Sequence, residues 1–179
     1  MKQYVAFLRG INLGNRRMPM ARLAQPFREL GFAEVSTFIA SGNVLFATKA
    51  TAGDRLERRI ATQLEQSLGY PVETFVRTRD EIRASVAARP FADEGLPGVT
   101  VTTGLLHEEV PLATAQALQA VKTATDEFAV GGRELHWLCR IRTSESKIWA
   151  EPALKALRLP TMTMRNRTTL TRLVALFDT

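Results

Sequence analysis

The spacing of hydrophobic residues changes repeatedly along the chain and predicts strands separated by helices. A continuous apolar run over residues 4–8 is typical of a buried strand. Apolar residues at helical spacing follow over 20–30, and Gly31 supplies a helix stop. Two further apolar runs, over 35–39 and 44–47, predict a pair of strands. The chain therefore opens with the order strand, helix, strand, strand.

A second helix and a fourth strand complete the first half. Leucine and isoleucine residues spaced by four predict a helix over 54–68, and Asp54 with Glu57 resembles a capping box at its start. Apolar and polar residues then alternate over 72–78, which predicts a strand. The first 78 residues thus have the order β-α-β-β-α-β, which is that of a ferredoxin-like fold.

The second half repeats this order after a link. Thr78 and Glu81 are spaced to cap a short link helix, and a Pro- and Gly-rich stretch follows over 89–98. The remaining predicted elements are a strand over 99–105, a helix from Pro111 to Val121, a hairpin of 127–130 and 134–139, a helix from Ser144, a strand over 161–164 and a last helix capped by Asn166. Pro152 leaves open a later start for the helix after Ser144. No residue-level repeat is evident, so the predicted duplication is one of pattern only.

These elements predict the α+β class, with two ferredoxin-like βαββαβ subdomains and a C-terminal helix. We place the first subdomain at residues 1–79, a linking helix and loop at 80–98, and the second subdomain with its C-terminal helix at 99–179. A chain of 179 residues is long enough to bury a core in such units.

Composition excludes several classes of protein. The chain is 45% hydrophobic and 23% charged, which is typical of a globular protein, and no apolar run reaches the roughly 18 residues that cross a bilayer. Arg9 interrupts the first apolar run, which argues against a signal peptide. Cys139 is the single cysteine and excludes an intrachain disulfide and a cysteine-rich metal site. We therefore expect a cytoplasmic protein with no cofactor and no membrane partner.

The net charge of +6 is concentrated toward both ends of the sequence. Residues 1–28 carry six basic groups and no acid, and residues 140–172 carry eight basic groups against Glu145 and Glu151. If these segments meet in the fold, they form a basic face that favours phosphate or nucleic acid. The alternative is that the arginines are spread over solvated surfaces.

The segment over 8–17 mixes glycine, asparagine and arginine where the first strand meets the first helix. Amide donors and positive charge at such a junction are typical of anion sites, and Arg9, Asn12 and Arg16 are the candidate ligands. The segment matches neither the P-loop pattern nor the dinucleotide pattern G-x-G-x-x-G. A tight turn with solvated arginines is the alternative.

Two further segments supply candidate binding residues. Ser41 and Asn43 lie in the turn between the second and third strands, but Ser41 lacks a G-x-S-x-G elbow, so a hydrogen-bonded turn is the alternative. Lys147 lies near one predicted helix start, and Arg165 and Asn166 lie at another. Cations gain nothing from the helix dipole there, which suggests an anionic partner; a plain solvated surface is the alternative.

The two histidines do not predict a metal site. His107 and His136 have no evident convergent partners among cysteines or carboxylates, so we expect no metal. His136 alternates with apolar neighbours in a strand, which predicts that it lies on a solvated face.

Six short motifs occur in order along the chain. They are Leu8-Arg9-Gly10-Ile11-Asn12, Val35 to Phe38, Ser41-Gly42-Asn43-Val44, Arg89-Pro90-Phe91, Ser146-Lys147 and Thr163-Met164-Arg165-Asn166. In combination they closely resemble the bacterial domain-of-unknown-function 1697 family over nearly the whole chain. The resemblance implies a small cytoplasmic protein of two ferredoxin-like subdomains with no established activity. Arg167 stands where the family has tryptophan, so no aromatic stacking platform is expected there, and Asn15 replaces a second family glycine.

The leading hypothesis is a binding protein for an anionic ligand, either a phosphorylated small molecule or a nucleic acid. One alternative is a small transferase or hydrolase acting on a phosphorylated substrate, with Ser41, Asn43 or Lys147 in its site. Another is a protein-interaction module. Whether the protein is an enzyme, and its oligomeric state, are left open by the sequence.

Overall fold

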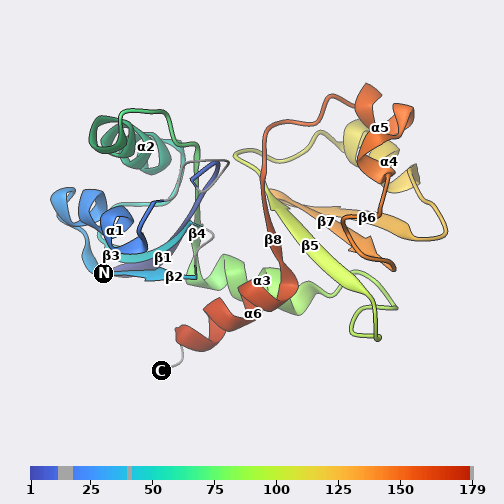
Figure 1. Cartoon of the computed structure of the whole chain (residues 1–179), viewed down its shortest axis with the longest axis horizontal. Helices are drawn as coiled ribbons and strands as arrows, with labels where there is room; N and C mark the ends of the chain where they lie inside the picture. The colour runs from blue at the N-terminus through green and yellow to red at the C-terminus, as the bar shows by residue number, and fades with distance from the viewer. Residues whose placement is uncertain (12–17, 40–41, 178–179) are drawn as a thin grey trace. The chain divides into compact units, whose positions relative to one another are not determined.

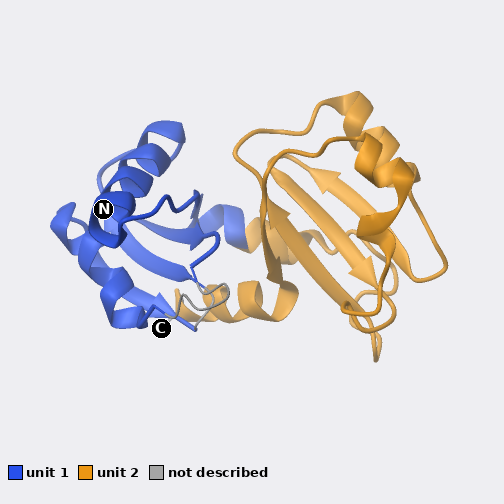
Figure 2. Ribbon diagram, turned by 45° about the horizontal axis from the view of Figure 1, so that its top comes forward, with its two compact units in different colours: residues 1–82 blue, residues 83–179 orange. Residues whose placement is uncertain are grey.

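Each half of the chain builds one four-stranded antiparallel sheet with helices packed on it (Figure 1). The computed structural model describes residues 1–11, 18–39 and 42–177. The chain divides into a first unit of residues 1–82 and a second unit of residues 83–179 (Figure 2). The helix α3 (Arg79–Ala88) carries the chain from the first unit to the second.

The first unit has the predicted order of elements. They are β1 (Lys2–Leu8), α1 (Met20–Glu29), β2 (Ala33–Phe38), β3 (Asn43–Thr48), α2 (Asp54–Leu68) and β4 (Thr74–Thr78), and the sheet order is β2-β3-β1-β4. Residues 4–8 of the central strand β1 are all buried, which explains their continuous apolar run. Phe27 and Ile60 from the two helices share one core cluster with Phe46 from β3.

The capping box predicted at Asp54 and Glu57 is wrong. Gly53 is the N-cap of α2 and no side chain caps this end. Glu57 is only 3% exposed, and its Oε1 accepts a hydrogen bond from the backbone nitrogen of Val76 at 2.7 Å and lies 4.0 Å from Nη1 of Arg77. Since β4 is an edge strand, this carboxylate satisfies an amide that no further strand can pair.

The capping box predicted at Thr78 and Glu81 is confirmed. Oε2 of Glu81 accepts from the backbone nitrogen of Thr78 at 2.7 Å, and Oγ1 of Thr78 accepts from the backbone nitrogen of Glu81 at 3.1 Å. These two bonds satisfy donors that the start of α3 would otherwise leave open.

Replacing Glu57 with alanine should destabilise the first unit by about 3 kcal/mol, because the buried Arg77 guanidinium and the Val76 amide lose this carboxylate. Equilibrium denaturation followed by circular dichroism measures the free energy of unfolding. Tryptophan fluorescence should follow the second unit alone, since Trp137 and Trp149 both lie there. Glu65→Ala, at an exposed position of α2, is the matched control, and equal losses in the two variants would contradict the prediction.

The second unit repeats the topology of the first. Its elements are β5 (Thr100–Leu105), α4 (Leu112–Ala120), β6 (Asp126–Gly131), β7 (Glu134–Cys139), the 3-10 helix η1 (Ile148–Ala150), α5 (Pro152–Ala156), β8 (Thr163–Asn166) and α6 (Arg167–Leu176), and the sheet order is β6-β7-β5-β8. The α+β class and the two βαββαβ subdomains are therefore confirmed. The predicted link 80–98 contains most of α3 and the loop after it.

One face of the second sheet carries the main apolar core. Leu135, Trp137 and Cys139 of β7 alternate onto this face and cluster with Leu118 of α4 and Leu154 of α5. The helix α6 packs against β5 and β8, and Figure 1 shows it on the other side of the sheet from α4 and α5. Both faces of this sheet are therefore covered.

The helix predicted from Ser144 does not form there. Oγ of Ser146 donates to Oδ1 of Asp126 at 2.7 Å and accepts from the backbone nitrogen of Ile148 at 3.2 Å, so the segment is held as a turn. The helix α5 begins instead at Pro152, whose missing N–H costs nothing in a first turn. The predicted cap at Asn166 is confirmed, because its side chain accepts from the backbone nitrogen of Thr169 at 2.8 Å.

The shared topology reveals a residue-level repeat that the sequence pattern did not show. In the first unit, Arg77 on the fourth strand is followed by a capping threonine and then Arg79. In the second unit, Arg165 on the fourth strand is followed by the cap Asn166 and then Arg167. Arg77 and Arg165 are both buried, and each donates from Nη1 to the carbonyl of the residue before it. This correspondence of single positions adds to the repeat in the order of elements.

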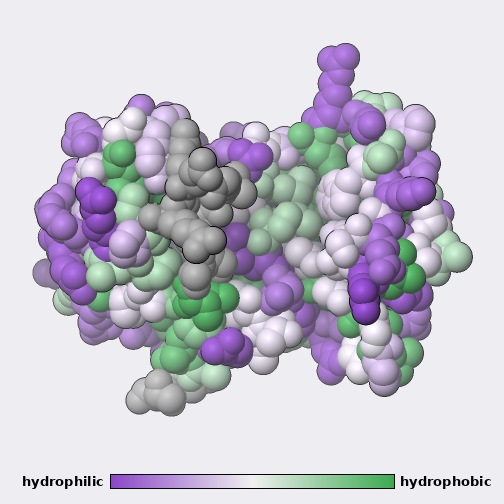
Figure 3. All heavy atoms as spheres, in the orientation of Figure 1, coloured by the Kyte–Doolittle hydropathy of each residue, from purple (hydrophilic) through white to green (hydrophobic). Residues whose placement is uncertain are grey.

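The surface is mostly polar, with isolated apolar exposures. On the face drawn in Figure 3, purple side chains are spread over both units, and green spheres gather over the C-terminal half of α6, where Leu176 is exposed. Among the described residues, no helix is long and apolar enough to cross a membrane.

Candidate functional site

Of the predicted residues of the first unit, Arg9 and Asn43 are described, and both lie near the end of β1. The backbone nitrogen of Leu8 donates to the carbonyl of Gly42 at 2.8 Å, so the end of β1 lies beside the residue that precedes β3. The guanidinium of Arg9 is half-exposed and lies 3.5 Å from Oε2 of Glu73. Asn43 is buried, and its Nδ2 donates across the turn to the carbonyl of Phe38 at 3.1 Å.

The remaining candidates of the first unit, Asn12, Arg16 and Ser41, lie outside the described residues. Their proposed role in anion binding stays a prediction.

Gly42 is required by both its conformation and its surroundings. Its φ is +73°, in the left-handed region that favours glycine. A Cβ at this position would lie 3.1 Å from the carbonyl oxygen of Leu8 and 3.2 Å from its Cβ. Any side chain would therefore push the turn away from β1.

Gly42→Ala should cost clearly more stability than Gly69→Ala. Both glycines have a positive φ, and Gly69 would meet nothing within 4 Å, so its replacement should cost about 1 kcal/mol of backbone strain. Gly42→Ala should add about 1–3 kcal/mol of overpacking against Leu8. Denaturation of the two variants followed by circular dichroism measures the difference, and equal costs would show that the contact with Leu8 is unimportant.

In the second unit, Arg165 is buried in β8. Its Nη1 donates to Oγ1 of Thr163 and to the carbonyl of Met164, both at 2.8 Å. Burial lowers the pKa of the Arg165 guanidinium to about 10, so the group is still charged at neutral pH. Lys147, by contrast, is exposed in the segment before η1.

The prediction that His136 lies on a solvated face is wrong. It is 4% exposed, because both faces of the second sheet are covered. Its Nδ1 lies 3.1 Å from Oγ1 of Thr103, and its Nε2 lies 3.5 Å from Oε2 of Glu134. This order resembles a nucleophile–base–acid triad, but Thr103 is fully buried and out of reach of a substrate. The three side chains therefore form an internal polar row.

Burial, with a smaller contribution from the charge of Arg167, lowers the pKa of His136 to about 4. In the folded protein the His136 imidazole therefore stays neutral in mild acid, whereas in the unfolded chain it is protonated below about pH 6.5. Stability should therefore fall by about 3 kcal/mol as the pH drops from 6.5 toward 4, and it should be unaffected by this group above that window. Tryptophan fluorescence during urea denaturation measures this change in the second unit.

His136→Gln should remove this part of the pH dependence, whereas His107→Gln should retain it. His107 is the matched control, because it follows the end of β5 and is not part of the buried polar row. An identical slope of stability against pH in His136→Gln and the parent protein would contradict the assignment.

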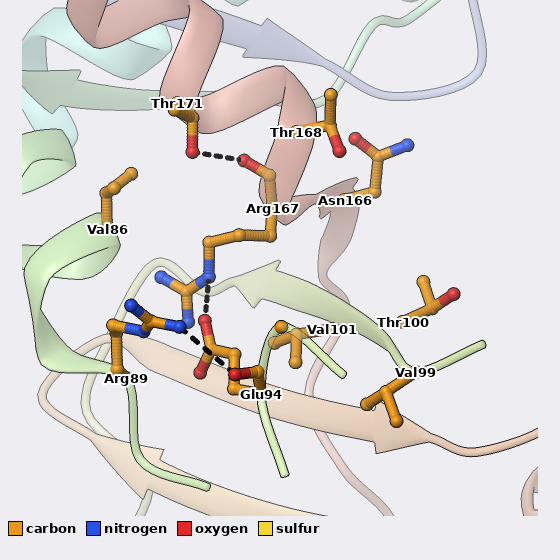
Figure 4. Close-up of a pocket in the computed structure, with 11 residues that line it drawn as sticks. Val86, Arg89, Glu94, Val99, Thr100, Val101, Asn166, Arg167, Thr168 and Thr171 are labelled. Atoms are coloured by element: carbon orange, nitrogen blue, oxygen red, sulfur yellow. Dashed lines mark hydrogen bonds and ion pairs between the residues drawn. The ribbon is translucent and has the colours of Figure 1, made fainter. Parts of the chain in front are cut away.

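A hollow of about 570 Å³ in the second unit lies beside the start of α6 (Figure 4). Its wall combines the ends of segments that are distant in the sequence. They are the end of α3, the loop after it, the start of β5 and the first turn of α6, which contribute Val86, Arg89, Glu94, Gly95, Val99, Thr100, Val101, Asn166, Arg167, Thr168 and Thr171. The predicted residue Asn166 borders this hollow, whereas Arg165 and Lys147 do not.

Two arginines and one carboxylate are linked at this wall. Nε of Arg167 lies 2.8 Å from Oε1 of Glu94, and its Nη1 donates to the carbonyl of Ser85. Nη2 of Arg89 donates to the backbone carbonyl of Glu94 at 3.0 Å. Gly95 leaves room for this contact, because a Cβ there would lie 3.1 Å from Nη2 of Arg89. The charged groups at the wall therefore sum to a positive charge.

Hydrogen-bonding capacity is left over in this cluster. Oε2 of Glu94 and Nη2 of Arg167 are buried and have no hydrogen-bond partner among the described residues. The approach of Nε to Oε1 is an ion pair without the alignment of a hydrogen bond. Buried polar atoms are rarely left in this state, so the wall of the hollow contains polar groups that a partner could still satisfy.

The start of α3 provides an internal comparison. It also lies beside a hollow, which is lined by Arg79 and Asp80 together with Lys2 and Gln3 from the start of β1. Its first turn carries Asp80 and Glu81, whereas the first turn of α6 carries no acid. Acidic groups offset the positive end of a helix, so the start of α6 is the one better suited to an external anion.

Sequence reasoning missed Arg89, Glu94 and Arg167 as site residues. Arg167 follows Asn166 at the helix start, and Arg89 belongs to the Arg-Pro-Phe motif, so both carried a signal. Glu94 carried none, because only the fold brings it to α6. Among the described residues, no three His, Cys, Asp or Glu side chains gather as a metal site.

The sequence model of a family described as a protein of unknown function (DUF1697) matches residues 1–136. The chain belongs to this family. The DUF1697 match contains Arg89 and Glu94 and ends within β7, so α6 lies beyond it.

The fold of this DUF1697 member also resembles that of a solved structure. It is the conserved bacterial protein SP0830 from Streptococcus pneumoniae, which is 20% identical, with a TM-score of 0.76 over 100% of this chain and 99% of that chain. At this level of identity the likeness shows the shared fold alone. No match was found among curated proteins.

Proposed function

We propose that this protein binds an anionic ligand, a phosphorylated small molecule or a nucleic acid, at the hollow beside α6. One observation carries the proposal: two guanidinium groups, Arg89 and Arg167, lie with a single carboxylate at an acid-free helix start, where Arg167 pairs with the Glu94 carboxylate and Arg89 donates to the Glu94 backbone carbonyl. The surplus positive charge has no counterpart in the cluster.

The chemistry of these groups suits phosphate. Guanidinium groups donate paired hydrogen bonds to phosphate oxygens, and the first amides of a helix point toward a bound anion. Thr168 adds a hydroxyl at the first turn of α6. The volume of about 570 Å³ falls within the range of small-molecule sites, roughly 300–1,000 Å³, which favours a phosphorylated metabolite over a long nucleic acid.

The loop after β1 remains a second proposed surface for the same class of ligand, through Arg9, Asn12 and Arg16. The described contacts do not favour the alternative of a transferase or hydrolase. Asn43 is buried in its turn, and Lys147 lies outside the wall of the hollow.

Arg89→Gln should weaken binding of a phosphate ligand by roughly tenfold, because one charge-assisted interaction is lost. Calorimetry with adenosine monophosphate and fluorescence anisotropy with a single-stranded RNA, each repeated over a series of salt concentrations, measure the affinities. Affinity should fall as salt rises if phosphate contacts dominate.

Arg142→Gln is the matched control, since Arg142 is exposed in the second unit and pairs only at 3.9 Å with Glu145. It removes the same charge away from the hollow and should leave affinity within twofold of the parent protein. Equal loss in the two variants, or no binding of either probe, would contradict the proposal.

A further inference from the structure

Glu94 is a buried carboxylate that borders the hollow with one oxygen unused. Its side chain is 7% exposed, Oε1 faces Arg167, and Oε2 accepts no hydrogen bond from any described residue. An ionised carboxylate can accept about four hydrogen bonds. The ion pair with Arg167 uses Oε1 and leaves Oε2 buried and unsatisfied beside the hollow. Oε2 of Glu94 therefore offers a strong acceptor to a bound ligand.

The charges at the wall limit the net charge of that ligand. Arg89 and Arg167 against Glu94 leave a single positive charge, to which the start of α6 adds a partial one. A phosphate monoester alone carries about −1.5 to −2 at neutral pH, which exceeds this balance. A monoester that also carries one positive group has a net charge near −1 and matches it.

We infer that the ligand is a phosphate monoester that bears a protonated primary amine. The phosphate binds at the first turn of α6 and Arg89, and the ammonium donates to Oε2 of Glu94. This inference rests on the proposed function, because it assigns a ligand class to the same hollow. A single carboxylate without further acidic ligands suits an ammonium better than a metal ion, which takes several oxygen ligands.

Three small phosphate esters test the role of the N–H donors. Phosphoethanolamine has a primary ammonium, phosphocholine carries the same charge without an N–H donor, and ethyl phosphate has neither. In calorimetric titrations of the whole protein, the dissociation constant of phosphoethanolamine should be at least about tenfold lower than that of phosphocholine. Of the two, only phosphoethanolamine can make the charge-assisted hydrogen bond to Glu94.

Glu94→Gln should abolish this preference while phosphate binding persists. Glutamine keeps one oxygen toward Arg167 but loses the negative charge. Glu145→Gln, at an exposed position of the second unit, is the matched control and should keep the preference. Tryptophan fluorescence during denaturation checks that Glu94→Gln is folded. If the variant is not folded, the comparison of phosphoethanolamine with phosphocholine in the parent protein tests the inference.

The outcomes separate the two proposals. Equal affinity for phosphoethanolamine and phosphocholine would overturn the inference about the amine and leave the phosphate site standing. Absence of binding for all three esters, together with adenosine monophosphate and RNA, would overturn the proposed function itself. A preference that survives Glu94→Gln would show that another group holds the amine, and would also overturn the inference.

Discussion

A buried guanidinium must be hydrogen-bonded, and each sheet of this protein meets that requirement on its fourth strand. Arg77 in β4 and Arg165 in β8 are both enclosed, and each turns back to the carbonyl of the residue before it. In each unit this arginine lies directly before the residue that caps the next helix. The helices α3 and α6 begin there, and each helix start borders a hollow.

Around these arginines the two sheets have diverged. In the first, Arg77 lies opposite Val5 of β1, which pairs in turn with Leu45 of β3. In the second, Arg165 lies opposite Thr103, which pairs with His136. The same three positions are thus mainly apolar in one unit and polar in the other. The buried histidine makes the second unit the one whose stability should fall in mild acid.

Most of the fold could be predicted from local periodicity, and the errors arose where tertiary contacts override it. Asp54 with Glu57 and Thr78 with Glu81 have the same spacing, yet only the second pair caps a helix. Glu57 lies next to Leu56 on the buried face of α2, where its carboxylate accepts a hydrogen bond from the backbone nitrogen of Val76 on the edge strand β4. Alternation along β7 predicts His136 on a solvated face, because the local pattern does not reveal that both faces of the sheet are covered.

The site was less predictable, because its members come from segments far apart in the chain. The cap Asn166 could be predicted from the local sequence, but Glu94 becomes a site residue only through its ion pair with Arg167, which is distant in the sequence. The duplicated Arg–cap–Arg strand end gives this molecule an internal reference. In a residue-resolved titration, Thr78 and Arg79 should report what a capped, acid-bearing helix start does in the ligand solution, while Asn166 and Arg167 report the response of the acid-free start. Each experiment on one unit thus carries its own comparison in the other, within a single polypeptide.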